Sequence, residues 1–305
     1  MIDAKVRTLI SLADTKSYTE TARELNLTQP AVSHHIKQLE EEYNIKIFNR
    51  VKNKLKLTPE GDILLKYAHR ILGLSDGARN AIEDCKNNVN HISIGVTQTI
   101  SEIFIPQIIA MYCNEHVNTT VNISTDSIKK IQDKLRHYEL DIAVVEGSLP
   151  SPDFTSTLLD TDSLVLITSP EHKLAGKASV TLADIKDETF IMRTKKSGTR
   201  ALIDSFLNAQ FESIKNLRVS IELDNATMIK ELVALNLGIS IMAKSVCLDD
   251  ARRGRLAIIP IENSNMVRDI NMVTHRDFAH PELLTELAEI YHAMKEQPPA
   301  WEGNI

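Results

Sequence analysis

The sequence predicts an α/β protein that starts with a winged helix-turn-helix, continues through one long linker helix and ends in a larger α/β region. Three observations support this order. Short amphipathic helices and a basic hairpin fill residues 1–58, an unbroken helical pattern follows, and β-rich runs alternate with helices from His91 onward. A chain of 305 residues is long enough for two or three domains.

The first region contains two helices joined by a short turn. Ser17 is a suitable N-cap for a helix that ends near Leu25, and Asn26 tolerates the left-handed conformation that closes such a helix. Thr28 then caps a further helix, and Pro30 fits its first turn because no amide partner is lost there. Two helices separated by so short a turn form a helix-turn-helix.

The helix within "TQPAVSHHIKQLE" has two different faces. Val32, Ile36 and Leu39 form an apolar stripe that should hold the helix to its domain. The opposite face offers hydrogen-bonding side chains, which are Gln29, Ser33, His34 and Lys37. Solvated helix faces have the same composition, so this pattern leaves open whether the residues face water or the edges of bases.

A basic hairpin, or wing, is predicted directly after this helix. Apolar residues recur at Ile45, Ile47, Leu55 and Leu57 around the polar tip "NRVKNK". Residues 1–58 hold ten Lys and Arg against seven Asp and Glu, whereas residues 59–305 hold 25 against 34. A basic module beside an acidic body indicates contact with a polyanion, although a basic loop by itself is commonly only solvated.

The linker helix should begin after the cap Thr58 and extend to about Asn87. Its apolar seam has heptad-like spacing and comprises Leu64, Ala68, Ile71, Ser75, Ala78 and Ile82. This seam could pack on its own domain. We expect a helix–helix dimer interface instead, because little core lies near a helix that joins a small module to a larger body.

From His91 onward, β-rich runs are separated by helices expected near 102–114, 126–138, 198–211, 226–237 and 280–296. Alternation of this kind predicts a parallel α/β arrangement. The region is large for one open sheet, and two α/β lobes that share a cleft would accommodate it.

The sequence argues against several classes of protein. Cys85, Cys113 and Cys247 lie far apart without a CxxC pair, so no disulfide framework and no metal site are predicted. No signal peptide or membrane-length apolar stretch is found, which favours a cytoplasmic protein without a membrane partner and disfavours a secreted solute-binding protein. An enzyme with an accessory module is disfavoured because no P-loop, dinucleotide fingerprint or nucleophile–base pattern occurs.

The motifs resemble those of the LysR-type transcriptional regulators. The run "SYTETARELNLTQPAVSHHIKQLEEEYNIKIFNR", followed by "LTPEGDILL", matches the order and spacing of that family's DNA-binding module, and the resemblance extends over the whole chain. It implies a C-terminal two-lobed effector domain similar to periplasmic binding proteins. The implied divisions are a DNA-binding domain at 1–58, a linker and dimerisation helix at 59–88, and an effector domain at 89–305, with lobe I at 89–161 and 267–305 and lobe II at 162–266.

The resemblance also assigns DNA-binding residues. Residues that match Gln29, Pro30 and Ser33 approach the bases in this family, and the residue that matches Arg50 approaches phosphate. Many members carry arginine where this chain has His34, which puts a bidentate guanine contact there in doubt. The remaining predicted DNA-binding residues are Thr28, mainly as a helix cap, with His34 and Lys37 on the helix and Lys52 and Lys54 at the wing tip.

Two loops are the main candidates for the effector site. In "GVTQTISE", the hydroxyls of Thr97, Thr99 and Ser101 follow a strand and open a helix, where they suit a carboxylate, sulfate or phosphate. Helix capping is the alternative interpretation. The second loop is "RTKKSGTR", and the resemblance implies that both loops border the effector cleft. The predicted effector-binding residues are Thr97, Gln98, Thr99, Ser101, Ser124, Thr125, Arg193, Thr199, Asn225 and Thr227.

These observations predict a transcriptional regulator and no enzyme. Its expected partners are double-stranded DNA and a small-molecule effector, an anionic co-inducer, with no other cofactor. Assembly as a homodimer or homotetramer is expected, and RNA polymerase is a further candidate partner.

Overall fold

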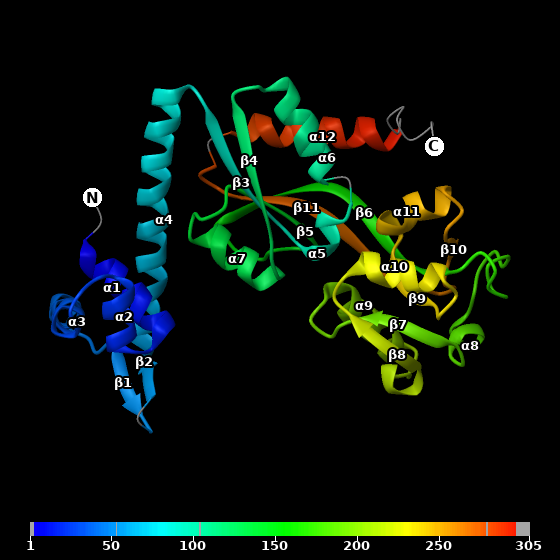
Figure 1. Ribbon diagram of the computed structural model, residues 1–305, viewed down its shortest axis with the longest axis horizontal. Coiled ribbons are helices and arrows are strands. Elements are labelled where there is room, and N and C mark those ends of the chain that lie inside the picture. Colours follow the sequence, from blue (N-terminus) through cyan, green and yellow to red (C-terminus); the bar gives the residue numbers. More distant parts are fainter. Residues whose placement is uncertain (1–2, 53, 104, 279, 297–305) are drawn as a thin grey trace. The chain divides into compact units, whose positions relative to one another are not determined.

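The computed structural model describes residues 3–52, 54–103, 105–278 and 280–296 (Figure 1). They form two compact units. The first unit contains the chain up to Ser93 together with residues 118–120 and 133–141, and the second contains the remainder.

Three helices open the first unit, namely α1 (Ala4–Thr15), α2 (Tyr18–Glu24) and α3 (Gln29–Tyr43). Asn26 has φ of 54°, so the left-handed turn predicted between α2 and α3 is confirmed. The N–H of Leu27 donates to the carbonyl of Ala22 at 2.8 Å and closes that turn. Leu9 and Leu12 of α1 form the core of this unit with the apolar side of α3.

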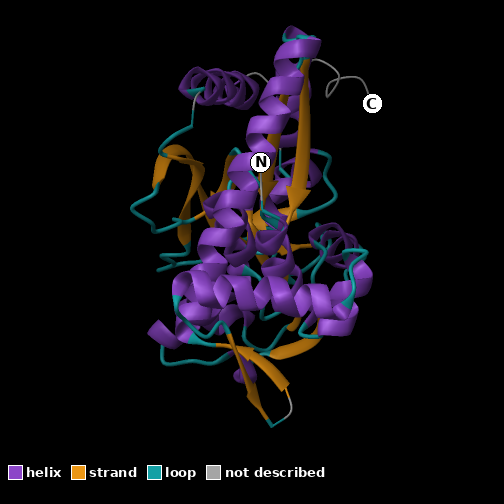
Figure 2. Ribbon diagram, turned by 90° about the vertical axis from the view of Figure 1, so that its left-hand side faces the viewer, coloured by secondary structure: helices purple, strands orange, loops and turns teal. Residues whose placement is uncertain are grey.

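The wing follows as β1 (Phe48–Val51) and β2 (Lys54–Leu57), an antiparallel pair that Figure 2 shows beyond the helices. The prediction that the first strand includes Ile45 and Ile47 is wrong. Ile47 is fully buried in the core, and its N–H donates to the Glu40 carboxylate at 2.9 Å, so this segment anchors the wing before the strand begins.

Glycine is required where the linker helix starts. A Cβ on Gly61 would lie 2.2 Å from the carbonyl oxygen of Ile47, a separation that no side chain tolerates. The Thr58 hydroxyl caps this helix by accepting from the N–H of Gly61 at 2.9 Å. The "LTPEG" motif therefore joins the wing and the linker helix through backbone contact.

The linker helix α4 (Pro59–Asn87) has the predicted length, but its apolar seam is divided. Leu64 and Ala68 pack against the core of their own unit, which contradicts their assignment to a dimer seam. The exposed apolar residues of α4 form a neighbouring row of Ile63, Tyr67, Ile71, Leu74 and Ile82. The helix thus has one face for its own module and a second face that is open.

The rest of the chain alternates helices and strands. The helices are α5 (Gln98–Ser101), α6 (Ile105–Glu115), α7 (Ile128–Arg136), α8 (Leu182–Ile185), α9 (Gly198–Ala209), α10 (Ala226–Ala234), α11 (Lys244–Arg252) and α12 (Pro281–Glu296), with a 3-10 turn at Ile214–Asn216. The strands are β3 (Asn90–Val96), β4 (Thr119–Thr125), β5 (Ile142–Glu146), β6 (Phe154–Thr168), β7 (Thr189–Arg193), β8 (Arg218–Leu223), β9 (Ser240–Ala243), β10 (Ala257–Ile259) and β11 (Val267–His275).

These strands build a mixed sheet, so the expected parallel arrangement holds only for some of the strand pairs. The sheet has the order β10-β6-β11-β5-β3-β4, and β9 also pairs with β6. Strands β3 and β5 are parallel, as are β7 and β8 in a separate pair, whereas β6 and β11 are antiparallel to each other and to their neighbours. Figure 1 shows β6 and β11 running side by side through the second unit.

The long strand β6 takes part in two different environments. Its residues up to Ser163 pair with β11, and from Leu164 onward they pair with β9 and β10. A large apolar core is built entirely from buried residues between Leu164 and Met266, around β7, β9, α9 and α10. Among the described residues, no helix is both long and apolar enough to cross a membrane.

Candidate functional site

Helix α3 separates its two faces cleanly. Val32, Ile36 and Leu39 are at most 5% exposed, and Ile36 and Leu39 belong to the core that α1 and the start of the wing share. The opposite residues are exposed, and we call them the α3 face: Gln29, Pro30, Ser33, His34 and Lys37. This face presents several hydrogen-bonding side chains on one side of a helix, and the major groove of DNA admits a helix whose side chains contact base edges.

The helix start confirms the role assigned to Thr28. Its hydroxyl accepts from the N–H of Ala31 at 3.3 Å, which makes it the N-cap. His35 lies 2.9 Å from the hydroxyl of buried Thr8, so this ring belongs to its own domain and diverges from exposed His34. Lys37 pairs at 3.5 Å with Glu41, an exposed contact worth only about 0.3–0.5 kcal/mol that leaves the ammonium free to reach phosphate.

The wing adds positive charge beside this helix. Strand register places Arg50 opposite Leu55, and Leu55 packs inward while Lys54 and Lys56 are exposed. Lys52 has φ of 49°, a left-handed conformation at the hairpin turn, and is also exposed. The predicted phosphate-binding side chains are therefore all accessible from solvent.

In the second unit, the loop that contains Thr97 leads to a buried carboxylate. Thr97 is the N-cap of α5, and its hydroxyl donates a short hydrogen bond to Glu146 at the end of β5. Thr99 is buried, whereas the Ser101 hydroxyl donates to the carbonyl of Gln98 at 2.7 Å. Because α5 has four residues, its dipole is too small for the anion site predicted at its start.

The positive charge comes from arginines instead. Arg268 on β11 lies with its Nη1 3.3 Å from the Glu146 carboxylate and 3.3 Å from the hydroxyl of Thr199. Its Nη2 is 3.8 Å from Asp162, whose carboxylate accepts from the backbone and hydroxyl of Ser245. Arg268 thus joins the end of β5 to the start of α9.

Arg193, at the end of β7, lies near the same group. Only 3% of it is exposed, and its carbonyl accepts from the fully buried guanidinium of Arg200 at 3.1 Å. Burial lowers the pKa of Arg193, while the carboxylates of Glu102 and Glu146 act in the opposite direction. We define the arginine cluster as Thr97, Glu102, Glu146, Asp162, Arg193, Thr199 and Arg268.

Several polar atoms in this cluster are unsatisfied. Within the described part of the chain, Nε of Arg193, Nε and Nη2 of Arg268 and Oε2 of Glu102 are buried without a hydrogen-bond partner. A buried donor or acceptor without a partner costs about 1–3 kcal/mol, and more when it is charged. Such atoms mark a place where a polar ligand gains binding energy.

The remaining predicted effector residues lie at element ends. Gln98 is exposed and donates to Glu102 at 2.9 Å, and Asn225 caps α10 by accepting from the N–H of Met228 at 2.9 Å. Thr227 is exposed in the first turn of α10. Ser124 and Thr125 close β4. Of these five described residues, Gln98 alone has a side chain that hydrogen-bonds to the arginine cluster, and the effector-binding role of all five stays a prediction.

Sequence reasoning missed Arg268, Glu146, Glu102 and Asp162. Arg268 carried a usable signal, because it is a charged residue in a β-rich run that precedes the apolar stretch "INMV". The acidic residues carried none, since Glu146 and Asp162 end or interrupt strands as many solvated residues do.

Two family models match this chain. Residues 4–62 match the bacterial regulatory helix-turn-helix proteins of the lysR family, and residues 87–295 match the LysR substrate binding domain. The chain belongs to the LysR family of transcriptional regulators. Members of this family bind DNA and effector ligands, and the chain is accordingly a regulator rather than an enzyme.

Individual relatives agree with this assignment. The probable RuBisCO transcriptional regulator of Phaeodactylum tricornutum is 28% identical over 277 residues, which cover 90% of each chain. Full-length CbnR complexed with its target DNA has a TM-score of 0.64 at 18% identity and covers 96% of this chain and 99% of that one. The CcmR regulatory domain from Synechocystis, in complex with 2-PG, has a TM-score of 0.58 at 23% identity and covers 69% and 100%. At these identities, the two solved structures establish the shared LysR fold.

Proposed function

We propose that this LysR-type regulator reads a specific DNA sequence with the α3 face and the basic wing, and that a small anion bound at the arginine cluster changes its affinity for DNA. The domain division at 1–58, 59–88 and 89–305 is part of this proposal. CbnR has been solved with its target DNA and the CcmR regulatory domain with 2-PG, so relatives of this fold take both kinds of ligand.

One observation carries the anion proposal. Two buried guanidinium groups, those of Arg193 and Arg268, have N–H donors that no described residue accepts. A carboxylate or phosphate provides several acceptor oxygens at once, and charge-assisted hydrogen bonds to arginine are about twice as strong as neutral ones. Arg268 lies close to the carboxylates of Glu146 and Asp162, so an incoming anion has to compete with them for its guanidinium.

The same geometry suggests how the effector acts. Arg268 is held by Glu146 and Thr199, which lie on β5 and α9, so it links the two sides of the cluster. An anion that binds Arg268 displaces the Glu146 carboxylate, and this changes the contact between β5 and α9. The free Oε2 of Glu102 is an acceptor, which favours anions that also carry a hydroxyl or amino group. The ligand then shifts the population between two arrangements.

Oligomerisation is the second part of the proposal. The exposed row on α4, from Ile63 to Ile82, places large apolar side chains in water over the length of a long helix. Such a stripe fits the same stripe of a second copy in an α4–α4 homodimer, and a homotetramer would pair two dimers. We place this DNA-binding protein in the cytoplasm and keep RNA polymerase as a candidate partner.

A thermal-shift screen of the full-length protein tests the anion proposal. Small carboxylates and phosphates, with and without hydroxyl or amino groups, are compared with their neutral amides and alcohols. We expect certain anions to raise the melting temperature of the wild type, because a ligand that binds only the folded state stabilises it. Arg193→Gln and Arg268→Gln should lose this shift.

The matched control is Arg253→Gln, which removes an exposed arginine that pairs with Asp249 on α11. This variant should respond to anions like the wild type. Equal anion responses in all four proteins, or a preference for the neutral compounds, would overturn the assignment of the arginine cluster.

A further inference from the structure

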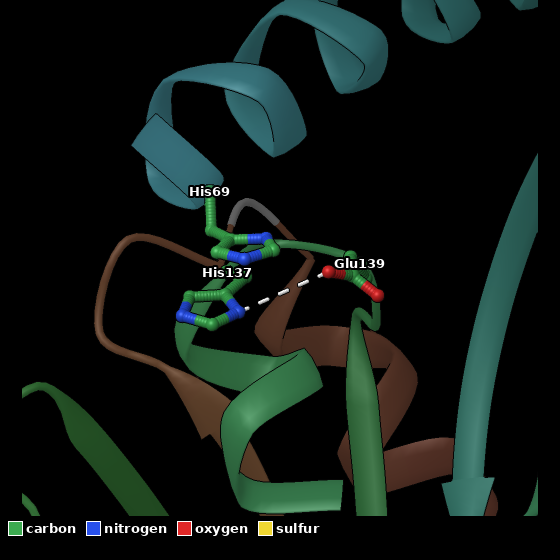
Figure 3. Close-up of side chains that lie close together, drawn as sticks. All are labelled: His69, His137 and Glu139. Carbon is green, nitrogen blue, oxygen red and sulfur yellow. Dashed lines mark ion pairs between the residues drawn. The ribbon is translucent and has the colours of Figure 1, made fainter. Parts of the chain in front are cut away.

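Two histidines and a glutamate meet away from the sites described above (Figure 3). The rings of His69, on α4, and His137, just after α7, stack with their centroids 4.5 Å apart and their planes 12° from parallel. Glu139 lies beside them, with its Oε1 3.9 Å from Nδ1 of His137. One ligand atom from each residue lies within 4.8 Å of those of the other two. We call this group the histidine cluster.

The turn after α7 brings His137 and Glu139 to the same side. Tyr138, between them, has φ of 58°, and this left-handed residue reverses the chain direction. The N–H of Glu139 then donates to the carbonyl of Lys134 at 2.9 Å, which fixes the reversal. A regular helix would separate residues two apart to different faces, so this turn is what places the two ligands together.

Close backbone packing positions His69, the third residue of the histidine cluster. Gly73 lies one turn after His69 on α4 and is buried. A Cβ at Gly73 would lie 1.7 Å from the carbonyl oxygen of His137, so only glycine lets α4 approach this closely. The approach holds His69 over the turn, and all three residues belong to the first compact unit.

Nearby charges are mixed. Arg70 and Arg136 face His137 with positive charge, and Asp133 faces it with negative charge. The Arg136 guanidinium lies 3.2 Å from the Asp133 carboxylate, which neutralises most of its effect. Glu139 places a carboxylate oxygen 3.9 Å from Nδ1 of His137, and a divalent cation bound here would be attracted to that negative charge.

We propose that His69, His137 and Glu139 bind a divalent transition metal ion of the zinc class. Two imidazoles and one carboxylate form a ligand set suited to Zn²⁺, Co²⁺ or Ni²⁺, and water completes the coordination. Metals bind the lone pair in the plane of the ring, so the His69 ring must turn out of the stack when the ion binds. The ion would tie α4 to the turn that leads directly into β5, whose last residue is Glu146.

Isothermal titration of the tag-free full-length protein, stripped with a chelator, tests this site with ZnCl₂ as the probe. We expect one tight Zn²⁺ site per chain. In a parallel titration, CoCl₂ should produce the visible absorption of Co²⁺ bound to protein ligands. His69→Gln, His137→Gln and Glu139→Gln should each weaken binding by more than about tenfold, since even losing a residue that only supports a ligand costs about 10–100-fold.

The three variants differ in how far they could disturb folding, so a loss of binding can be separated from misfolding. Glu139 is exposed, so Glu139→Gln should fold normally even if a histidine substitution disturbs the packing around Gly73. The control is His116→Gln, which removes a histidine that pairs with Glu286 at 3.0 Å but lies outside the cluster. Zn²⁺ binding that is absent in the wild type, or unchanged in Glu139→Gln and both histidine variants, would overturn the proposal.

Discussion

The α3 face and the arginine cluster are both suited to charged or polar ligands, but they are built differently. The α3 face comes from one continuous helix, and packing within the first unit holds it in place. The arginine cluster brings together Glu146, Arg193 and Arg268 from three strands that are distant in sequence. A site on one helix depends on local propensity, whereas an assembled site depends on the fold of the whole region.

This difference predicts different sensitivities. Damage to the first unit should impair DNA binding and spare the effector site. Damage to the arginine cluster should impair effector binding and leave DNA binding without effector intact. In the complete protein, an effect of one ligand on the binding of the other should appear only when both are present. Substitutions at Leu39, Gln29 and Glu146 test this contrast.

Leu39→Ala should have the largest effect. Leu39 is 5% exposed on the buried side of α3, and truncating a buried leucine costs about 2–5 kcal/mol of folding free energy. Urea unfolding followed by circular dichroism should show an early loss of the first unit, while the anion-dependent thermal shift of the second unit persists. Leu235→Ala, at a side chain 68% exposed, should stay within about 0.5 kcal/mol of the wild type. Equal destabilisation by both would contradict the assigned packing.

Gln29→Ala tests base reading directly. Removing one base contact should cost about 1–3 kcal/mol on the selected duplex and leave binding to unrelated DNA unchanged. Fluorescence anisotropy on both duplexes measures this difference. Gln38 lies about two and a half turns further along α3, on the opposite side, and is half-buried, so Gln38→Ala should not change sequence preference. An equal loss of affinity for both duplexes would instead mean that Gln29 contacts phosphate or supports folding.

Glu146→Gln should strengthen effector binding. The Glu146 carboxylate pairs with Arg268 in the absence of ligand, so it competes with an incoming anion. Removing its charge weakens this competitor by about 1.5 kcal/mol, which corresponds to roughly tenfold tighter anion binding. Calorimetry on the full-length protein measures the change. Weaker binding in this variant would mean that Glu146 contacts the effector itself.

The sequence predicted the first unit well because its signals are local. The cap at Thr28, the left-handed Asn26 and the apolar stripe of α3 each depend on residues within a few positions. The division of the α4 seam was not predictable in the same way. Leu64 and Ala68 belong to a core that α1 and the wing complete, and nothing in the helix itself reveals those neighbours.

The second unit was predictable only as an α/β alternation. The antiparallel pairing of β6 with β11 joins segments that are far apart in the sequence, and a periodic pattern does not indicate which strand lies beside which. Thr97, Arg193 and Thr199 were expected near the effector from their positions at element ends. Arg268 and Glu146 enter the cluster only because that strand pairing places them there. The histidine cluster was missed for the same reason, since His69 meets His137 only through the contact at Gly73.

The α3 face and the arginine cluster should be energetically linked, and a calorimetric comparison measures this link. An anion identified by the thermal-shift screen is titrated into the full-length protein, first free and then saturated with a duplex that the protein has selected from a random library. We predict that DNA changes the affinity for the anion by a factor of about 5–150, the usual range for linked sites. Identical affinities with and without DNA would show that the two sites are not linked.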